Sequence, residues 1–282
     1  MEIKDLVGLE KPLTKLIEVV AEGIGVAYSD TLGVTAEVRR REKFAQVQQK
    51  IELMNIDTKI EADDRIQQRL IAQEARRQEN IDQTVREAAG FLPETVTDDK
   101  PDPDWTTAFF NIVQDVSSTE MRTLWAKILS GEVAKPGTYS RRTLEIMKSL
   151  SAEEAKNFQR LHGFIFGNYV VFKLGNESGS LSSLGVHHVD WKMMHEAQLV
   201  ASAEDLRITI SGGPSPWFVV GNRKIRFHSE SGNPIVVQIK QLTDVGAQLS
   251  HLVTDVVANE DYLLALQSYY KNNGAVVTIE NS

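Results

Sequence analysis

The sequence of 282 residues contains no cysteine. This absence excludes disulfides, thiol nucleophiles and zinc sites built on cysteine, and it fits the reducing interior of a bacterial cell. The sequence also lacks an uninterrupted run of about 18 apolar residues, so we expect no ordinary membrane-spanning helix. Its first eight residues carry Glu2 and Asp5 and lack an apolar stretch, unlike a signal peptide. We therefore expect a cytoplasmic protein.

Positive charge is scarce as well. The chain has 31 lysines and arginines against 39 aspartates and glutamates, which gives a net charge of -8. Proteins that coat nucleic acid with their whole surface rely on clustered Lys and Arg, so this class is not favoured. A local basic patch is still compatible with the charge balance. With 41% hydrophobic residues the chain can build a core, and we expect it to be folded.

The motifs of the common catalytic sites are missing too. No GxxxxGK[ST] phosphate loop, GxSxG nucleophile elbow or HExxH zinc motif occurs. His188 and His195 could share a helical face near Glu196, but they lack the i,i+4 spacing of a helical metal site. We expect no catalytic residues, no metal and no cofactor. A hydrolase or nuclease site assembled from distant residues stays open as an alternative.

An amphipathic helix is expected within residues 6–34, where Pro12 suits a helix start. The apolar face consists of five side chains at helical spacing: Leu13, Leu16, Ile17, Val20 and Ile24. One interpretation is that this face docks on the protein core or on a neighbouring subunit. The other is that it lies on a membrane surface, although its charges are mixed rather than mainly basic.

Residues 35–90 are prone to form helix throughout, because they contain no proline and no glycine before Gly90. A short apolar seam ends near Asp63 and Asp64 and restarts at three residues: Ile66, Leu70 and Ile71. The seam does not keep a strict heptad, so a long coiled coil does not follow from it. One long helix, or two helices with a break near residues 55–57 or 63–64, are both compatible with the pattern.

Residues 92–103 contain three prolines and four acidic residues and cannot continue a helix. We expect this segment to be a linker between a helical N-terminal arm, residues 1–91, and a compact body. The body starts with a helical core over residues 104–167. Ser118, Ser140 and Ser151 are the expected N-caps of three of its short helices, and Gly131 is expected to end one of them.

The pattern changes over residues 168–282, where short alternating strands are mixed with helices. Residues 206–210 alternate as a half-buried strand does, and residues 221–223 suit a hairpin turn. The predicted fold class is therefore α+β, mainly α. It combines a long N-terminal helical arm, a central bundle of short helices and a small C-terminal α+β module with antiparallel strands.

One block of the helical core resembles a known family. Residues 124–132 read LWAKILSGE and residues 136–144 read PGTYSRRTL. This block is similar to the LWAxILxGE and PGxxSxRTL signature of an uncharacterised bacterial and phage family, a domain of unknown function. The resemblance is densest over residues 105–158, weaker over residues 8–28 and thin at the C-terminus. It implies no activity, but it implies a link to mobile elements and a role in phage defence.

Most residues of this block are capping and core types, which indicates a structural role. The exceptions are Glu132, Arg141 and Arg142, which could form an ion pair that holds the loop or could contact a partner or a phosphate. Our first hypothesis is a non-enzymatic, oligomerising interaction or sensor protein with an unidentified protein partner. The alternatives are a DNA-binding regulator with a winged-helix-like core and a membrane-active effector that uses its N-terminal segment.

Overall fold

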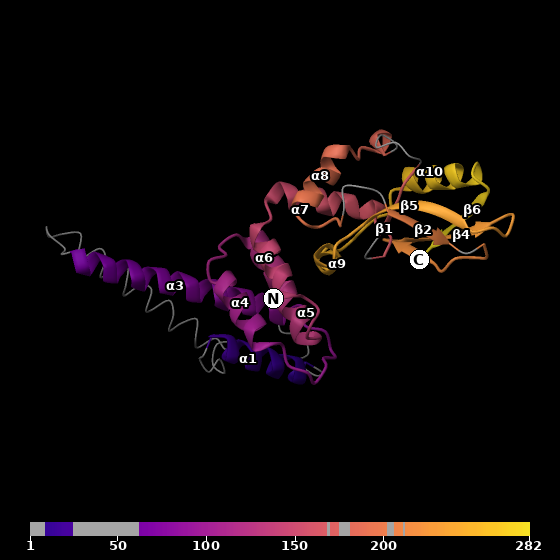
Figure 1. Cartoon of the computed structure of the whole chain (residues 1–282). Coiled ribbons are helices and arrows are strands. Elements are labelled where there is room, and N and C mark those ends of the chain that lie inside the picture. The colour runs from indigo at the N-terminus through magenta and orange to yellow at the C-terminus, as the bar shows by residue number, and fades with distance from the viewer. Residues whose placement is uncertain (1–8, 25–61, 168–169, 175–180, 202–205, 211) are drawn as a thin grey trace. The chain divides into compact units, whose positions relative to one another are not determined.

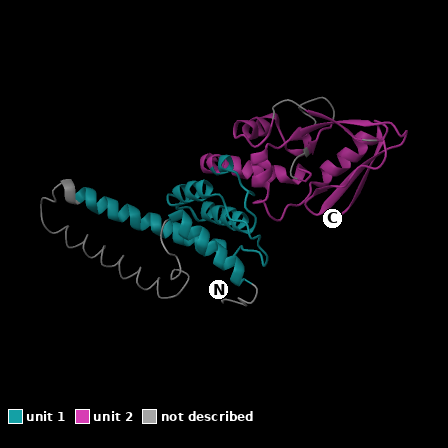
Figure 2. Cartoon of the chain, turned by 60° about the horizontal axis from the view of Figure 1, so that its bottom comes forward, with its two compact units in different colours: residues 1–144 teal, residues 145–282 magenta. Residues whose placement is uncertain are grey.

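The computed structural model describes residues 9–24, 62–167, 170–174, 181–201, 206–210 and 212–282 (Figure 1). The chain divides into two compact units, Met1–Leu144 and Glu145–Ser282 (Figure 2). The boundary falls inside helix α6, Arg141–Ser149. The boundaries expected from the sequence, at residues 92–103 and 167–168, stay a prediction.

Unit 1 is helical over its described residues. Its helices are α1 (Glu10–Ile24), α3 (Ala62–Ala89), α4 (Pro103–Val113) and α5 (Thr119–Ala134), followed by the first turn of α6. The C-terminal half of α3 packs along α5, and α1 packs against α4 and α5. The N-terminal half of α3 extends beyond the other helices of the unit (Figure 1).

Aromatic side chains fill the core of unit 1. Trp105 stacks on Phe109 with ring centroids 5.2 Å apart, and Phe109 meets Trp125 edge-on at 5.8 Å. Leu16 and Val20 of α1 are fully buried in the same unit. Gly23 lets α1 pack closely against α4, because a Cβ at this position would lie 2.3 Å from Phe110 Cδ2.

The structure refines several sequence-based expectations about this unit. Residues 92–102 are not helical, as expected, but they are attached to the bundle. Thr97 donates its backbone N–H to the Ala134 carbonyl at 3.0 Å, and Lys15 Nζ donates to the Thr97 carbonyl at 2.9 Å. The segment therefore joins α1 to the end of α5, where sequence reasoning had placed a linker.

One predicted helix end is wrong, and one of the open alternatives for α3 is excluded. Helix α5 does not end at Gly131 but continues to Ala134, because Gly131 serves side-chain packing instead of a helix cap. Helix α3 runs through Asp63 and Asp64, so no break occurs there. The alternative break at residues 55–57 lies outside the described residues.

Predicted N-caps are confirmed at several helices. Ser118 caps α5 by accepting the Met121 N–H. Ser151 caps α7, Ala152–Leu161, and forms a full capping box with Glu154. Ser140 Oγ accepts the Thr143 N–H at the start of α6. Short helices need such caps because their end groups are otherwise unsatisfied.

Unit 2 contains two antiparallel three-stranded sheets together with helices. The helices are α7, η1 (His162–Phe164), η2 (Ser182–Leu184), α8 (His188–Glu196), α9 (Asp244–Ser250) and α10 (Glu260–Lys271). The first sheet has the order β1-β5-β2, formed by Val170–Phe172, Ile235–Gln241 and Leu206–Ile210. The second has the order β3-β4-β6, formed by Phe218–Val220, Arg223–Ser229 and Ala275–Asn281.

An aromatic core holds unit 2 together. Phe172 of β1 contacts Phe218 and Phe227 of the second sheet, with ring centroids 5.1 and 4.8 Å apart. Tyr262 of α10 is fully buried and donates its hydroxyl proton to the Phe172 carbonyl at 2.5 Å. Burial raises the pKa of Tyr262, so its hydroxyl stays a proton donor. The fold class is α+β and mainly α, as predicted.

Candidate functional site

Glu132 lies inside unit 1 and is only 2% exposed. Its carboxylate accepts the backbone N–H of Gly137 at 2.6 Å and that of Tyr139 at 2.9 Å. Burial raises the pKa of this carboxyl, and the backbone donors oppose the shift. Glu132 therefore holds the loop after α5 through backbone amides, and it is not offered at the surface to a partner.

The same loop explains the glycine of the motif. Tyr139 is buried, and a Cβ at Gly131 would lie 2.8 Å from Tyr139 Cε2. Burial and the Glu132 charge raise the pKa of Tyr139 to about 12. The most distinctive sequence block of the chain thus encodes packing between the end of α5 and its following loop.

The two arginines of the block lie at the start of α6 and are exposed. Arg141 Nη1 contacts Asp104 Oδ2 at 3.2 Å, so its partner is the first turn of α4 and not Glu132. Arg142 remains a surface cation. The structure does not bring the three candidate residues Glu132, Arg141 and Arg142 together into one site.

The apolar face of α1 covers the core of unit 1. Leu16 and Val20 are fully buried, while three more side chains of this face are partly exposed: Leu13, Ile17 and Ile24. This arrangement matches the interpretation of a helix docked on the core. No helix among the described residues is long and apolar enough to cross a membrane.

A patch of apolar side chains remains on the N-terminal half of α3. Ile66, Leu70 and Ile71 are 47%, 49% and 56% exposed, and we call them the α3 ridge. Residues 65–79 contain no buried residue, whereas Ile81, Val85 and Ala88 are buried against the rest of unit 1. Within the described part of the chain, α3 is therefore anchored by its C-terminal half, while residues 65–79 bury no side chain.

Charges of both signs lie along the N-terminal half of α3. Asp63 and Asp64 precede Arg65 and Arg69, and Glu74 precedes Arg76 and Arg77. Arg77 contacts Glu74 at 3.0 Å and Asp115 at 2.9 Å, which anchors the helix where it reaches the bundle.

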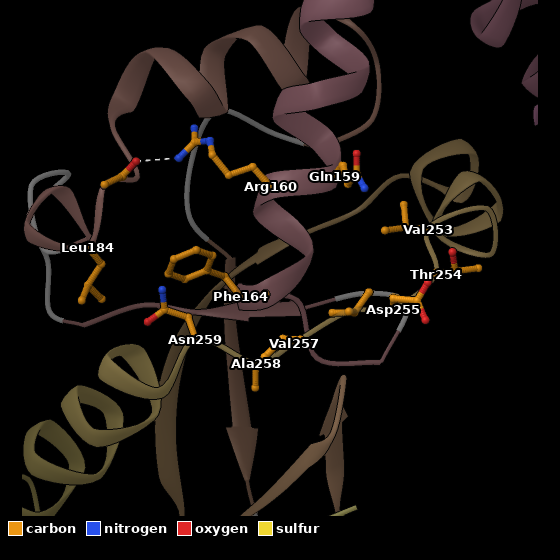
Figure 3. A pocket seen from close by; sticks show the side chains of 13 residues that line it. Gln159, Arg160, Phe164, Leu184, Val253, Thr254, Asp255, Val257, Ala258 and Asn259 are labelled. Carbon is orange, nitrogen blue, oxygen red and sulfur yellow. Dashed lines mark hydrogen bonds between the residues drawn. The ribbon is translucent and has the colours of Figure 1, made fainter. Parts of the chain in front are cut away.

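An open pocket of about 670 Å³ lies in unit 2 between the end of α7 and the segment before α10 (Figure 3). Gln159 and Arg160 project from α7 on one side, and residues 253–259 form the other side. Val257 in this wall is 70% exposed. Asn259 donates its backbone N–H to the Gly163 carbonyl at 3.0 Å, which holds the wall against η1.

Arg160, the cation of this pocket, is already engaged by its own chain. Its guanidinium contacts Asp190 Oδ1 at 2.7 Å, donates to the Asn157 side chain at 2.7 Å and donates to the Gly185 carbonyl at 2.6 Å. A ligand would therefore find a largely neutralised cation here. Among the described residues, no cluster of three or more histidine, aspartate or glutamate side chains could hold a metal ion.

Comparison with known proteins identifies a family of unknown function. The model of a family described as protein of unknown function, DUF2806, matches residues 64–267. The match extends from α3 into α10 and includes the motif block, whereas α1 and β6 lie outside it. Neither the comparison with curated proteins nor the comparison with solved structures finds a match.

Proposed function

We propose that this chain, which belongs to the DUF2806 family of proteins of unknown function, is a non-catalytic interaction protein that self-associates through α3. The observation that carries the proposal is the α3 ridge, three large apolar side chains on a helix half that the rest of the described chain leaves uncovered. A cytoplasmic role in phage defence or prophage biology, with a further protein partner, follows from the resemblance of the motif block and is part of the same proposal.

The energetics of α3 favour a covered ridge. Most helix stability in proteins comes from the packing of an apolar face. None of residues 65–79 of α3 is buried, so the apolar side chains of this stretch contribute no such packing within the described chain. Covering Ile66, Leu70 and Ile71 would remove apolar area from water and stabilise the helix at the same time.

A second copy of the chain is the occupant that we propose for the ridge. Both ends of the ridge carry mixed charge: Asp63, Asp64, Arg65 and Arg69 lie toward one end, and Glu74, Arg76 and Arg77 lie toward the other. An antiparallel pair of α3 helices would join apolar side chains at its centre and place charges of both signs at each flank, where ion pairs between the copies can form. The other candidate occupant is a segment within residues 25–61 of the same chain, and it predicts a monomer.

Light scattering coupled to size-exclusion chromatography tests the proposal on the full chain. We expect an oligomer that becomes a monomer when Ile66→Glu and Leu70→Glu are combined. The matched control combines Ala72→Glu and Arg76→Gln, two exposed positions with the same i,i+4 spacing and the same total charge change, on the side of α3 away from Ile66, Leu70 and Ile71. This control should stay oligomeric.

Two results would overturn the proposal. The first is a full chain that is monomeric across the micromolar range. If the helicity of that monomer falls in the ridge variant and not in the control, the ridge is covered by a segment of its own chain. The second is an oligomer that the ridge variant leaves intact. Circular dichroism of both variants verifies that unit 1 and unit 2 remain folded.

A further inference from the structure

The outer face of the sheet β3-β4-β6 carries an aromatic ring between two cations. In the register of the sheet, Phe218 pairs with Ile225 and Val219 pairs with Lys224. Continuing this alternation places Trp217 across from Arg226. Lys224, Arg226 and His228 of β4 therefore share one face with Trp217, and Ile225 and Phe227 lie on the opposite face.

The two faces differ sharply in burial. Val220, Ile225, Phe227, Ala275 and Val277 on the inner face are at most 1% exposed. On the outer face none of the side chains is buried: Trp217, Val219, Lys224, Arg226, His228, Val276, Thr278 and Glu280. Val219 is 42% exposed. The described part of unit 2 thus leaves this face open to solvent.

Trp217 is partly exposed and has both cations within contact of its ring. The Arg226 guanidinium carbon lies 4.7 Å from the ring centroid, and the Lys224 ammonium lies 4.9 Å from it. Both distances are typical of cation–π interactions. The Arg226 guanidinium and the Lys224 ammonium therefore lie against the Trp217 ring on the outer face of the sheet. We call Trp217, Lys224 and Arg226 the tryptophan patch.

The patch keeps positive charge in an acidic protein. Lys224 contacts Glu280 at 3.5 Å, whereas no ion pair among the described residues involves Arg226. The chain has a net charge of -8, so carboxylates are abundant elsewhere. A guanidinium that stacks on tryptophan without a carboxylate partner presents its donors to an anionic ligand.

We propose that the tryptophan patch binds single-stranded nucleic acid. An open sheet face with a partly exposed aromatic ring lets an unpaired base stack on the side of the ring that the cations leave free, and the cations contact the phosphates that flank the base. A duplex hides its base faces from such a ring, so single strands are the favoured form. This site goes beyond self-association through α3 and does not depend on it.

Fluorescence anisotropy of labelled oligonucleotides with the full chain tests the site. The probes are oligo-dT and oligo-U of about 20 nucleotides, and a duplex of equal length, at low salt. We expect Trp217→Ala to weaken single-strand binding by about tenfold or more, as loss of a stacking side chain does. Arg226→Gln should weaken binding and reduce the salt-dependence slope by about 0.7, the value for one phosphate contact on a single strand.

Two controls separate the patch from general effects. Arg207→Gln removes an exposed cation from β2 in the other sheet and should leave binding unchanged. Intrinsic fluorescence reports stacking directly, because Trp105, Trp125 and Trp191 are buried and Trp217 is partly exposed. Oligonucleotide should quench the wild type, and Trp217→Phe should lose that quenching while the sheet keeps its aromatic ring.

Four outcomes would overturn the proposal. These are no binding of any single strand at about 50 mM salt, equal binding by wild type and Trp217→Ala, equal affinity for single strand and duplex, and equally effective competition by polyglutamate of matched charge. The last result would identify acidic protein segments as the ligand of this face. Thermal melts of Trp217→Phe and Arg226→Gln verify that losses of binding are not losses of fold.

Discussion

Single side chains in unit 1 hold the chain where secondary structure alone does not. The Glu132 carboxylate accepts two backbone N–H groups of the loop that follows α5, and Tyr139 of that loop packs on Gly131. A buried carboxylate is destabilising unless donors surround it. Glu132 therefore combines favourable hydrogen bonds with the unfavourable burial of a charge. Its net contribution to the free energy of unfolding consequently depends on pH.

The sign of that pH effect follows from the direction of the pKa shift. Burial raises the pKa of Glu132 in the folded state above its ordinary value of 4.5. Its contribution to stability is then fully present below the unfolded pKa and is lost as pH rises through the folded pKa. Glutamine at this position cannot titrate, so Glu132→Gln is the reference.

Urea denaturation at several pH values measures this contribution. We expect the free energy of unfolding of the wild type, relative to Glu132→Gln, to fall as pH rises above 4.5 and then to level off. A difference that does not vary with pH, or one that grows with pH, would contradict the assignment. Glu153→Gln, an exposed change on α7, serves as the control.

At the scale of elements, the sequence predicts what is encoded locally. The strand Leu206–Ile210 was predicted with its observed bounds, because its apolar and polar side chains alternate. The end of α5 was predicted wrongly, because Gly131 resembles a cap in the sequence but is used for a contact with Tyr139. That contact involves a loop whose path no local pattern reveals.

The two candidate surfaces, the α3 ridge and the tryptophan patch, also differ in whether the local sequence reveals them. Ile66, Leu70 and Ile71 were recognisable as an apolar seam, because helical periodicity is local. The tryptophan patch was missed, because Trp217 and Arg226 meet only through the register of β3 and β4. A hairpin turn at residues 221–223 was predicted, and counting outward from it places Trp217 across from Phe227. The observed pairing of Val220 with Arg223 leaves two residues in the turn, which shifts the register by one and places Trp217 across from Arg226.

Helix α1 offers a test of packing between elements. A Cβ at Gly23 would lie 2.3 Å from Phe110 Cδ2 and 2.6 Å from Thr106 Cγ2. Alanine is normally the better helix former, by about 1 kcal/mol. Here we expect Gly23→Ala to destabilise unit 1 by about 1–3 kcal/mol, because α1 must move away from α4. Denaturant midpoints measure the change, and Thr14→Ala on the exposed side of α1 should stay within about 0.5 kcal/mol of the wild type. A stabilising Gly23→Ala would disprove the close contact.

At the scale of the whole molecule, the chain has two cores that share no central residue. Unit 1 is built around Phe109 and Trp125, and unit 2 is built around Phe172, Phe227 and Tyr262. The compact units divide within α6. Composition marks residues 92–102 as a segment without helix, and their hydrogen bonds to Lys15 and Ala134 attach them to unit 1.

Hydrogen exchange distinguishes the two units. We expect Trp125→Ala to destabilise unit 1 by about 3–5 kcal/mol, as large-to-small changes of buried aromatic side chains do. Amides of α3 and α5 should then exchange faster, while amides of β4 and β5 keep their protection. Phe227→Ala should produce the reverse pattern. Equal loss of protection in both units from either change would show a single cooperative unit.

The position of β6 sets the order in which the protein can form during synthesis. Strand β4 pairs with β6 along its whole length, from Arg223 with Asn281 to Ser229 with Ala275. A ribosome that has released unit 1 still holds the partner of β4, so unit 1 can fold on the emerging chain while β4 keeps one edge unpaired. The nascent protein therefore passes through a stage in which its N-terminal half is complete and its C-terminal half needs protection from aggregation.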